Sequence, residues 1–341
     1  MERAKAQKVL NPKSVWLPVV IGISIVVFLA YRDDQFSGRS LQLFSDFRVA
    51  FLLFVFFLLL IKDGLNAFRI RLLSHGQLNG LSAIRIVLLW EFAIAVTPPV
   101  IGAAAVLVFI VYKEGQPLGK ALAYTLLLAI LDNLFFLTAS PLAIGLSNGA
   151  VFPILKEAPA FFESGVSRVF WLSYTSIAFY TFFMLSALLF FPETVKKILT
   201  YLMTFRVLRR WKEPVIQQSE ELVLASKVLR GQSPAYWVKL LAATYAIWIF
   251  KFALINAWVS GFNQVSVNDQ LLMLGRHLTM WVVMLVSPSP GNAGTAEFIF
   301  PVFYEDFAGK YTFISGLLWR LTTYYPYLIA GVLLIPKWWK K

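Results

Sequence analysis

The side chains that could do chemistry gather in one short stretch of an otherwise apolar chain. This stretch combines hydroxyl, amide and carboxylate groups with helix-breaking residues: Ser287, Pro288, Ser289, Pro290, Gly291, Asn292, Gly294, Thr295 and Glu297. A proline break inside an apolar segment removes a backbone donor and frees a carbonyl, and lipid offers neither group a partner. Such a break persists where protein or water satisfies these groups, so the stretch is our main candidate for binding a charged headgroup.

A second break, Thr97-Pro98-Pro99, interrupts another apolar segment 190 residues earlier, counted from Pro98 to Pro288. Paired breaks in corresponding positions of two halves indicate a transport site. Thr97 and Pro98, with Glu91 two helical turns before them, complete the candidate substrate-binding set. The alternative for Glu91 is an ion pair with Arg85 or Arg276.

Further charges lie within apolar segments, where charged side chains usually find partners. Asp132 and Arg320 occupy the segments that follow the two breaks, and we predict that they form an intramembrane charge pair. The alternative is two unrelated polar residues. Glu297 has an alternative role as a cap for the free amides at its break. Lys251 is interpreted as a residue that snorkels toward the outer end of its segment.

The composition places the chain among multispanning membrane proteins, because 59% of its 341 residues are hydrophobic and only 14% are charged. Cysteine is absent, which excludes disulfides, thiolate metal sites and a cysteine nucleophile. The two histidines, His75 and His277, lack a helical metal-ligand spacing, and no phosphate-binding glycine loop is present. The net charge of +13 comes from loops between apolar segments, which indicates membrane topology rather than nucleic-acid binding.

The distribution of basic residues predicts the topology. The apolar segments cover approximately 15–31, 47–62, 85–112, 118–146, 167–191, 235–258, 271–304 and 311–335. The loop 192–239 holds nine basic residues against four acids, so it should face the cytoplasm. If all five apolar segments before this loop crossed the membrane from a cytoplasmic amino end, the loop would face outward. We therefore expect the segment 85–112 to dip into the membrane and return to the same side. The same argument makes 271–304 a dip from the opposite face.

We therefore predict an all-α polytopic membrane protein with six full transmembrane helices and two re-entrant, proline-broken hairpins from opposite faces. Phe47–Leu146 and Ala235–Ile335 would be the two halves of an inverted repeat. Between Val195 and Trp211, apolar residues recur at helical spacing among lysines and arginines. This pattern predicts a helix lying on the cytoplasmic leaflet, or else it reflects only the bias of basic residues toward that side.

The stretch from Pro288 to Glu297 has the pattern Pro-x-Pro-Gly-x-x-Gly-x-x-Glu, and Arg320 and the run Tyr324 to Gly331 follow it. With Phe68 to Leu73 before the first break, these motifs resemble the lysylphosphatidylglycerol synthase transmembrane-region family over about residues 15–335. The resemblance is to the flippase-like integral membrane domain, without the soluble aminoacyl-transferase domain. It implies movement of a lipid or lipid-linked substrate, and we expect no lipid aminoacylation.

We interpret residues 1–341 as one integral membrane domain with a cytoplasmic basic loop at 192–239. We expect a flippase-like transporter in the cytoplasmic (inner) membrane of a bacterial cell, with both chain ends in the cytoplasm. We expect no enzymatic activity, cofactor, metal or nucleic-acid partner. Its expected partners are membrane lipids, anionic on the cytoplasmic face, and the sequence leaves open a homo-oligomer or a lipid-modifying enzyme as partner. The rival function is a non-transporting scaffold or accessory subunit for such an enzyme.

Overall fold

The computed structural model describes residues 43–97, 103–153, 160–205, 212–287 and 289–340, together with Val20 and Ser24. All regular secondary structure in these residues is helical. The short helices are η2 (Phe44–Asp46), the π-helix η3 (Ser186–Phe190), η5 (Pro290–Asn292) and η6 (Gly309–Tyr311). The predicted first span, 15–31, and the proline pair Pro98-Pro99 lie outside the described residues.

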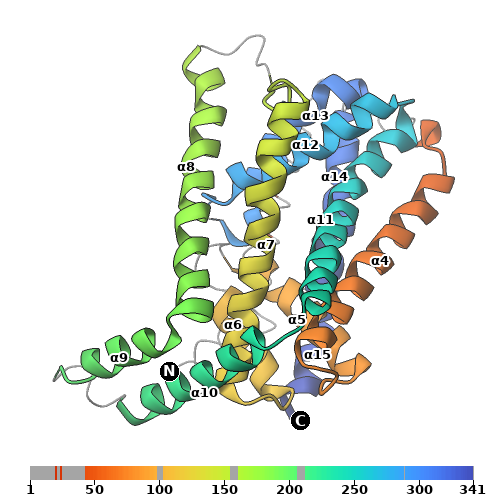
Figure 1. Cartoon of the computed structure of the whole chain (residues 1–341). Helices are drawn as coiled ribbons and strands as arrows, with labels where there is room; N and C mark the ends of the chain where they lie inside the picture. Colours follow the sequence, from red (N-terminus) through yellow and green to blue (C-terminus); the bar gives the residue numbers. More distant parts are fainter. Residues whose placement is uncertain are drawn as a thin grey trace.

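The part of the chain that the structure describes contains four long apolar helices, which run along the length of the molecule (Figure 1). They are α4 (Ala50–Leu73), α7 (Leu118–Leu146), α8 (Ala160–Leu185) continued by η3, and α11 (Pro234–Phe262). Each is long and apolar enough to cross a membrane, which needs about 20 predominantly apolar residues. The chain is therefore an integral membrane protein, and the predicted segment 118–146 coincides with α7.

Helix α4 is longer than the predicted segment 47–62, because its charged second half is buried rather than solvated. Lys62, Asn66 and Arg69 are 2%, 5% and 1% exposed. A buried charge needs a partner, and each of these side chains has one inside the protein, as described below. Hydropathy ends at the first charge, whereas the helix continues to Leu73.

Both predicted helix breaks are present. Helix α5 (Gly80–Val96) is separated from α6 (Ala103–Lys113), and α12 (Val267–Met284) is separated from α13 (Thr295–Ala308) by a loop that contains η5. In Figure 1, α5 and α6 lie in the lower half of the molecule, and α12 and α13 lie in the upper half. The two broken segments thus approach the centre from opposite ends.

The predicted segment 311–335 is also broken, which the sequence analysis did not anticipate. Helix α14 (Thr312–Thr323) ends at Tyr324, and α15 (Tyr325–Lys340) begins directly after it. The Tyr324 backbone has a non-helical φ of −124° and ψ of −59°. Pro326 explains the break, because proline lacks the N–H that would continue the hydrogen-bond ladder.

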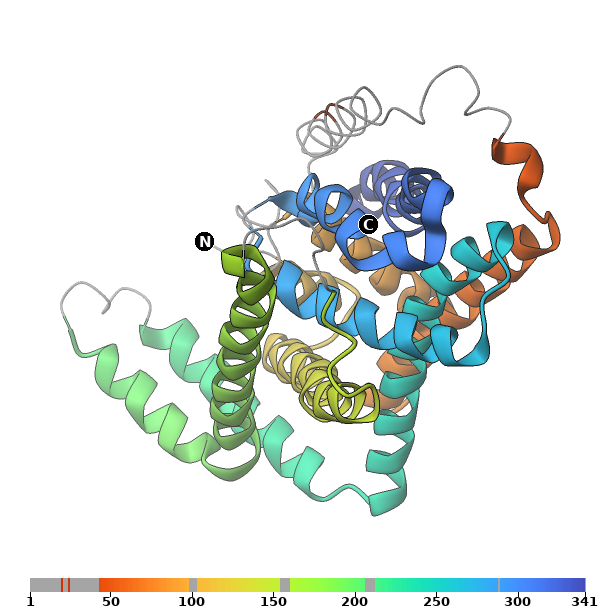
Figure 2. The same cartoon turned by 90° about the horizontal axis from the view of Figure 1, so that it is seen from above.

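Two helices lie across one end of the bundle. Helices α9 (Pro192–Leu202) and α10 (Lys212–Arg230) run across the long helices and extend beyond them (Figures 1 and 2). On α9, Ile198, Tyr201 and Leu202 are exposed, and Lys196 pairs with Glu220 of α10 at 3.0 Å. This orientation agrees with the predicted interfacial helix over its first part, while residues 206–211 lie outside the described chain.

Candidate functional site

The two helix breaks meet near the centre of the bundle. The Gly291 amide donates a hydrogen bond to the Thr97 carbonyl at 3.2 Å. The Tyr324 hydroxyl donates to the Ala95 carbonyl at 3.2 Å. Gly291 has a φ of +58°, and a Cβ there would lie 2.5 Å from the Ala95 oxygen. Glycine alone tolerates both the left-handed backbone and this close approach, so the contact between the breaks depends on it.

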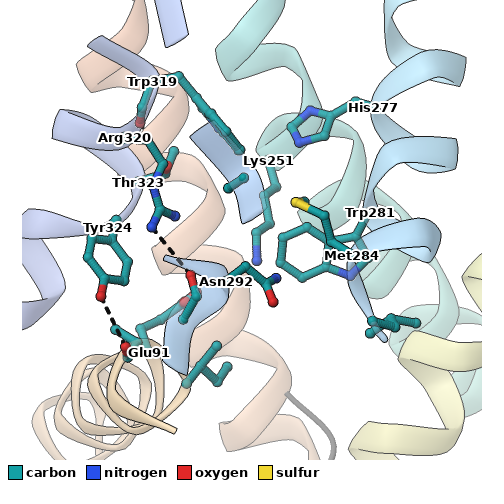
Figure 3. Close-up of a pocket in the computed structure, with 15 residues that line it drawn as sticks. Glu91, Lys251, His277, Trp281, Met284, Asn292, Trp319, Arg320, Thr323 and Tyr324 are labelled. Atoms are coloured by element: carbon teal, nitrogen blue, oxygen red, sulfur yellow. Dashed lines mark hydrogen bonds between the residues drawn. The ribbon is translucent and has the colours of Figure 1, made fainter. Parts of the chain in front are cut away.

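A cavity of about 80 Å³, lined by both charged and apolar side chains, lies beside this contact, with room for several water molecules. The lining residues labelled in Figure 3 are Glu91, Lys251, His277, Trp281, Met284, Asn292, Trp319, Arg320, Thr323 and Tyr324. They come from α5, α11, α12, η5 and α14, with Tyr324 at the junction of α14 and α15. The cavity therefore joins both broken segments to one of the long helices.

Lys251 points into this cavity, between Asn292 and Trp281 (Figure 3). Its Nζ atom lies 4.3 Å from the ring centroid of Trp281 and 4.8 Å from that of Trp248. The interpretation that Lys251 snorkels toward the outer end of its helix is therefore wrong. The long lysine stem instead carries the charge inward, between two indole rings that favour a cation.

Glu297 and Arg320 form a buried ion pair at the second break. The Arg320 Nε atom donates to Glu297 Oε1 at 2.8 Å, and the second carboxylate oxygen accepts the Gly294 amide at 2.7 Å. Arg320 also donates to the Gly291 carbonyl at 3.3 Å, and its guanidinium lies 4.0 Å from the Tyr324 ring centroid. The carboxylate thus caps the first turn of α13, in the geometry of the alternative role for Glu297.

The predicted pair between Asp132 and Arg320 is wrong, because each residue has a different partner. Asp132 binds Arg69 Nη1 at 2.5 Å and accepts the Trp248 indole N–H at 3.0 Å. Arg69 also donates to Thr244 at 3.1 Å and to Asn66 at 3.1 Å. This pair joins α4, α7 and α11, whereas the Glu297–Arg320 pair holds the second break.

Glu91 forms an ion pair with Lys62 at 2.7 Å. The alternative predicted an ion pair for Glu91, but its choice of Arg85 or Arg276 as the partner is wrong. Lys62 also contacts Asp63 at 3.0 Å and donates to the Tyr327 hydroxyl at 2.8 Å. A charge at depth takes the nearest opposite charge, and α4 packs directly on α5.

The two arginines considered for Glu91 have acidic partners of their own. Arg85 binds Glu114 at 2.7 Å, and Arg276 binds Asp306 at 3.0 Å. Burial would raise the pKa of Glu114, yet hydrogen bonds from Arg85, Ser82 and Trp338 hold that pKa below its ordinary value. Glu114 therefore stays ionised in the loop that connects α6 and α7.

The hydroxyl residues of the second break bind one another rather than line the cavity. Ser287 Oγ lies 2.9 Å from Ser289 Oγ and 2.8 Å from Thr295 Oγ1. The Thr97 hydroxyl donates to the Ala93 carbonyl of its own helix at 2.6 Å. Gly294 is the N-cap of α13 at a φ of +88°, and Pro290 begins η5. These residues shape the break and satisfy its polar groups.

Of the predicted substrate-binding residues, the structure brings Glu91, Gly291 and Asn292 to the cavity wall. Arg320, predicted as half of a charge pair, joins them there. Pro98 and Pro288 lie outside the described residues. Sequence reasoning assigned Lys251 to the membrane surface and missed the aromatic walls; a lysine well inside the 29-residue helix α11 was the available signal.

The lining offers ionic and hydrogen-bond recognition. Its titratable residues are Glu91, Lys251, His277, Arg320 and Tyr324. Within the described part of the chain, no group of three His, Asp or Glu side chains could hold a metal ion. Chemically, the site is suited to bind a polar, charged group.

An apolar groove of about 590 Å³ opens between α7, α11 and α12, next to the cavity. Phe135, Leu142, Ile249 and Leu271 are among its lining residues. Phe252 also lines the groove, and its ring centroid lies 4.3 Å from that of His277, which lines the cavity. The Phe252–His277 contact therefore forms a shared wall between the apolar groove and the cavity that the charged side chains line.

The helices and the buried charges together define a polytopic α-helical membrane protein with a polar interior site. Residues 15–331 match the family model described as the lysylphosphatidylglycerol synthase TM region, and the chain belongs to this family. It is 27% identical over 335 residues to a UPF0104 membrane protein of Archaeoglobus fulgidus, with 92% of this chain and 93% of the relative covered. No solved structure matches the chain. The resemblance based on the second break is thereby confirmed.

Proposed function

We propose that this protein is a flippase-like transporter that moves a lipid or lipid-linked molecule across the membrane. The observation that carries the proposal is the cavity with charged side chains at the meeting point of the two helix breaks, beside an apolar groove. A polar headgroup would occupy the cavity while its acyl chains remain in the groove or the surrounding lipid. The protein would act as a carrier rather than an enzyme.

The proposed arrangement in the membrane has six full spans and two re-entrant hairpins, α5–α6 and α12–α13, related as an inverted repeat. Their approach from opposite ends of the bundle supports it (Figure 1). We propose that this end of the molecule faces the cytoplasm, because α9 and α10 carry basic residues, and that both chain ends lie on the same side of the cytoplasmic membrane. Alternating access would come from rocking of the two halves around the cavity.

Cysteine labelling tests this orientation, because the chain contains no cysteine. Pro117 and Glu305 are exposed near opposite ends of the molecule. We expect Pro117→Cys to react with an impermeant maleimide only after the cells are permeabilised, and Glu305→Cys to react in intact cells. Labelling of Pro117→Cys from outside would overturn the orientation of the first hairpin.

Translocation can be measured in proteoliposomes with fluorescent lipids and an impermeant quencher. We expect the wild-type protein to expose inner-leaflet label faster than protein-free liposomes. Thr323 lines the cavity, so Thr323→Phe should fill it and reduce the rate to nearly that of protein-free liposomes. Ser176→Phe is the matched control, since Ser176 is exposed on α8, and it should translocate normally.

The rival function is a scaffold that recruits a lipid-modifying enzyme. The exposed apolar side chains of α9 and the basic loop around it would provide its docking surface. A folded wild-type protein that leaves the lipid distribution unchanged for every lipid class would favour the scaffold over the transporter.

A further inference from the structure

We propose that Lys251 is the anion-binding residue of the central cavity and that it binds the phosphate of a lipid headgroup. The inference rests on the proposed transport function and names the substrate class of the same site. It has four supports in the structure: the surroundings of Lys251, the pairing of the neighbouring cations, the unsatisfied acceptors in or beside the cavity, and the adjoining apolar groove.

Among the described residues, the Lys251 ammonium has no counter-ion. In the described part of the chain, its Nζ atom has no hydrogen bond and no carboxylate within ion-pair distance, and its contacts are with the indole faces of Trp248 and Trp281. Removing an ammonium from bulk water is costly unless it is paired and hydrogen-bonded. Cation–π contacts replace only part of that hydration, so the group is prepared for an anion.

The neighbouring buried cations are already neutralised. Lys62 binds Glu91 at 2.7 Å, Arg69 binds Asp132 at 2.5 Å, and Arg320 binds Glu297 at 2.8 Å. Glu91, the carboxylate that lines the cavity, is thus engaged by Lys62 on α4. Of the buried cations beside the cavity in the described residues, Lys251 is therefore the one available to bind an anionic ligand.

The cavity also has acceptors that an alcohol could satisfy. The buried Asn292 Oδ1 and His277 Nε2 atoms have no hydrogen-bond partner among the described residues. The His277 Nδ1 atom faces the Phe252 carbonyl at 3.3 Å, which places the ring proton on Nδ1 and leaves Nε2 as an acceptor. A headgroup that carries both a phosphate and hydroxyl groups, such as a glycerol phosphate, would match this set.

The apolar groove favours a lipid over a free phosphate ion. Its volume of about 590 Å³ is far larger than that of the cavity, and Phe252 and His277 form the wall between the two. A phosphate bound at Lys251 would lie next to a surface suited to acyl chains. Burying those chains adds favourable free energy that inorganic phosphate cannot supply.

The test is calorimetric titration of the full-length protein in detergent with three probes. They are dihexanoyl phosphatidylglycerol, dihexanoyl glycerol, which lacks the phosphate, and inorganic phosphate. We expect phosphatidylglycerol to bind most tightly, and Lys251→Met to weaken its binding about tenfold or more, as expected for loss of a charged hydrogen bond. Lys251→Arg should restore most of the affinity. Lys239→Met, an exposed lysine on the same helix, is the matched control and should bind as the wild type does.

Thermal unfolding of the same variants separates ligand binding from a structural role. Because no carboxylate of the described residues pairs with Lys251, Lys251→Met should unfold at the wild-type temperature or above it. Equal affinity of Lys251→Met and wild type would overturn the anion site, even if the wild type translocates lipid. If inorganic phosphate and phosphatidylglycerol bind with equal affinity, and both lose that affinity in Lys251→Met, the ligand is phosphate itself and the proposal of a lipid is overturned. Lys251-dependent binding by a protein that does not translocate would support the site and contradict the transport function.

Discussion

Arg320→Gln is expected to destabilise the protein by about 3–5 kcal/mol, because it leaves the Glu297 carboxylate buried without its ionic partner. The two side chains are 7% and 6% exposed. Arg320 also holds the Gly291 carbonyl and stacks on Tyr324, so its loss should loosen the contact between the two helix breaks. Thermal unfolding in detergent would measure the effect, with the exposed Arg168→Gln on α8 as the control.

A double-mutant cycle identifies the partner of Arg320. The double variant Arg320→Gln/Glu297→Gln should lose less free energy of unfolding than the two single variants lose together, since neither charge is then left unpaired. Combining Arg320→Gln with Asp132→Asn should be additive, because Asp132 binds Arg69 instead. Coupling to Asp132 rather than to Glu297 would contradict the pairing in the structure.

The same pair changes what is expected of Glu297→Gln. The sequence analysis placed Glu297 among the residues that could bind a charged headgroup, with a cap for the free amides as its alternative role. The structure instead places one carboxylate oxygen on Arg320 and the other on the Gly294 amide. We therefore expect Glu297→Gln to lower both the unfolding temperature and the translocation rate. The cavity residue better suited to report on substrate alone is Lys251.

The features that the sequence predicted correctly are those that depend on neighbours along the chain. Helix α7 begins and ends where its apolar segment does, because length and hydropathy are enough to define a buried helix. The breaks at Thr97 and around Gly291 follow from proline and glycine chemistry within a few residues. The break at Tyr324 had the same kind of signal in Pro326, although the apolar run around it concealed the interruption.

The charge pairing could not be predicted in this way. Arg69 and Asp132 are 63 positions apart, and which side chains meet depends on the rotation of α4 and α7 about their axes. Nearly uniform hydropathy around a buried helix gives no information on that rotation. For the same reason, the sequence could not show that Lys251 points between two tryptophans rather than toward the membrane surface.

Arg69→Met is expected to destabilise the protein by about 3–5 kcal/mol, because Arg69 is 1% exposed and joins three helices through its guanidinium. The change leaves Asp132 without its ion pair and removes the hydrogen bonds to Thr244 and Asn66. Arg69→Lys should recover little of the lost stability, since one ammonium cannot reproduce the planar guanidinium that binds all three partners at once. The measurement is thermal or denaturant unfolding in detergent.

Arg71→Met is a matched control for this prediction, because Arg71 lies two residues further along α4 with its side chain exposed. It should unfold within about 0.5 kcal/mol of the wild type, as expected for a surface substitution. Asp132→Leu added to Arg69→Met should recover part of the lost stability, since no unpaired carboxylate then remains in the interior. If Arg69→Met lowers the free energy of unfolding no more than Arg71→Met does, the charged side chains of α4 are solvated rather than buried. The length of α4 beyond Lys62 would then need an explanation other than buried pairing.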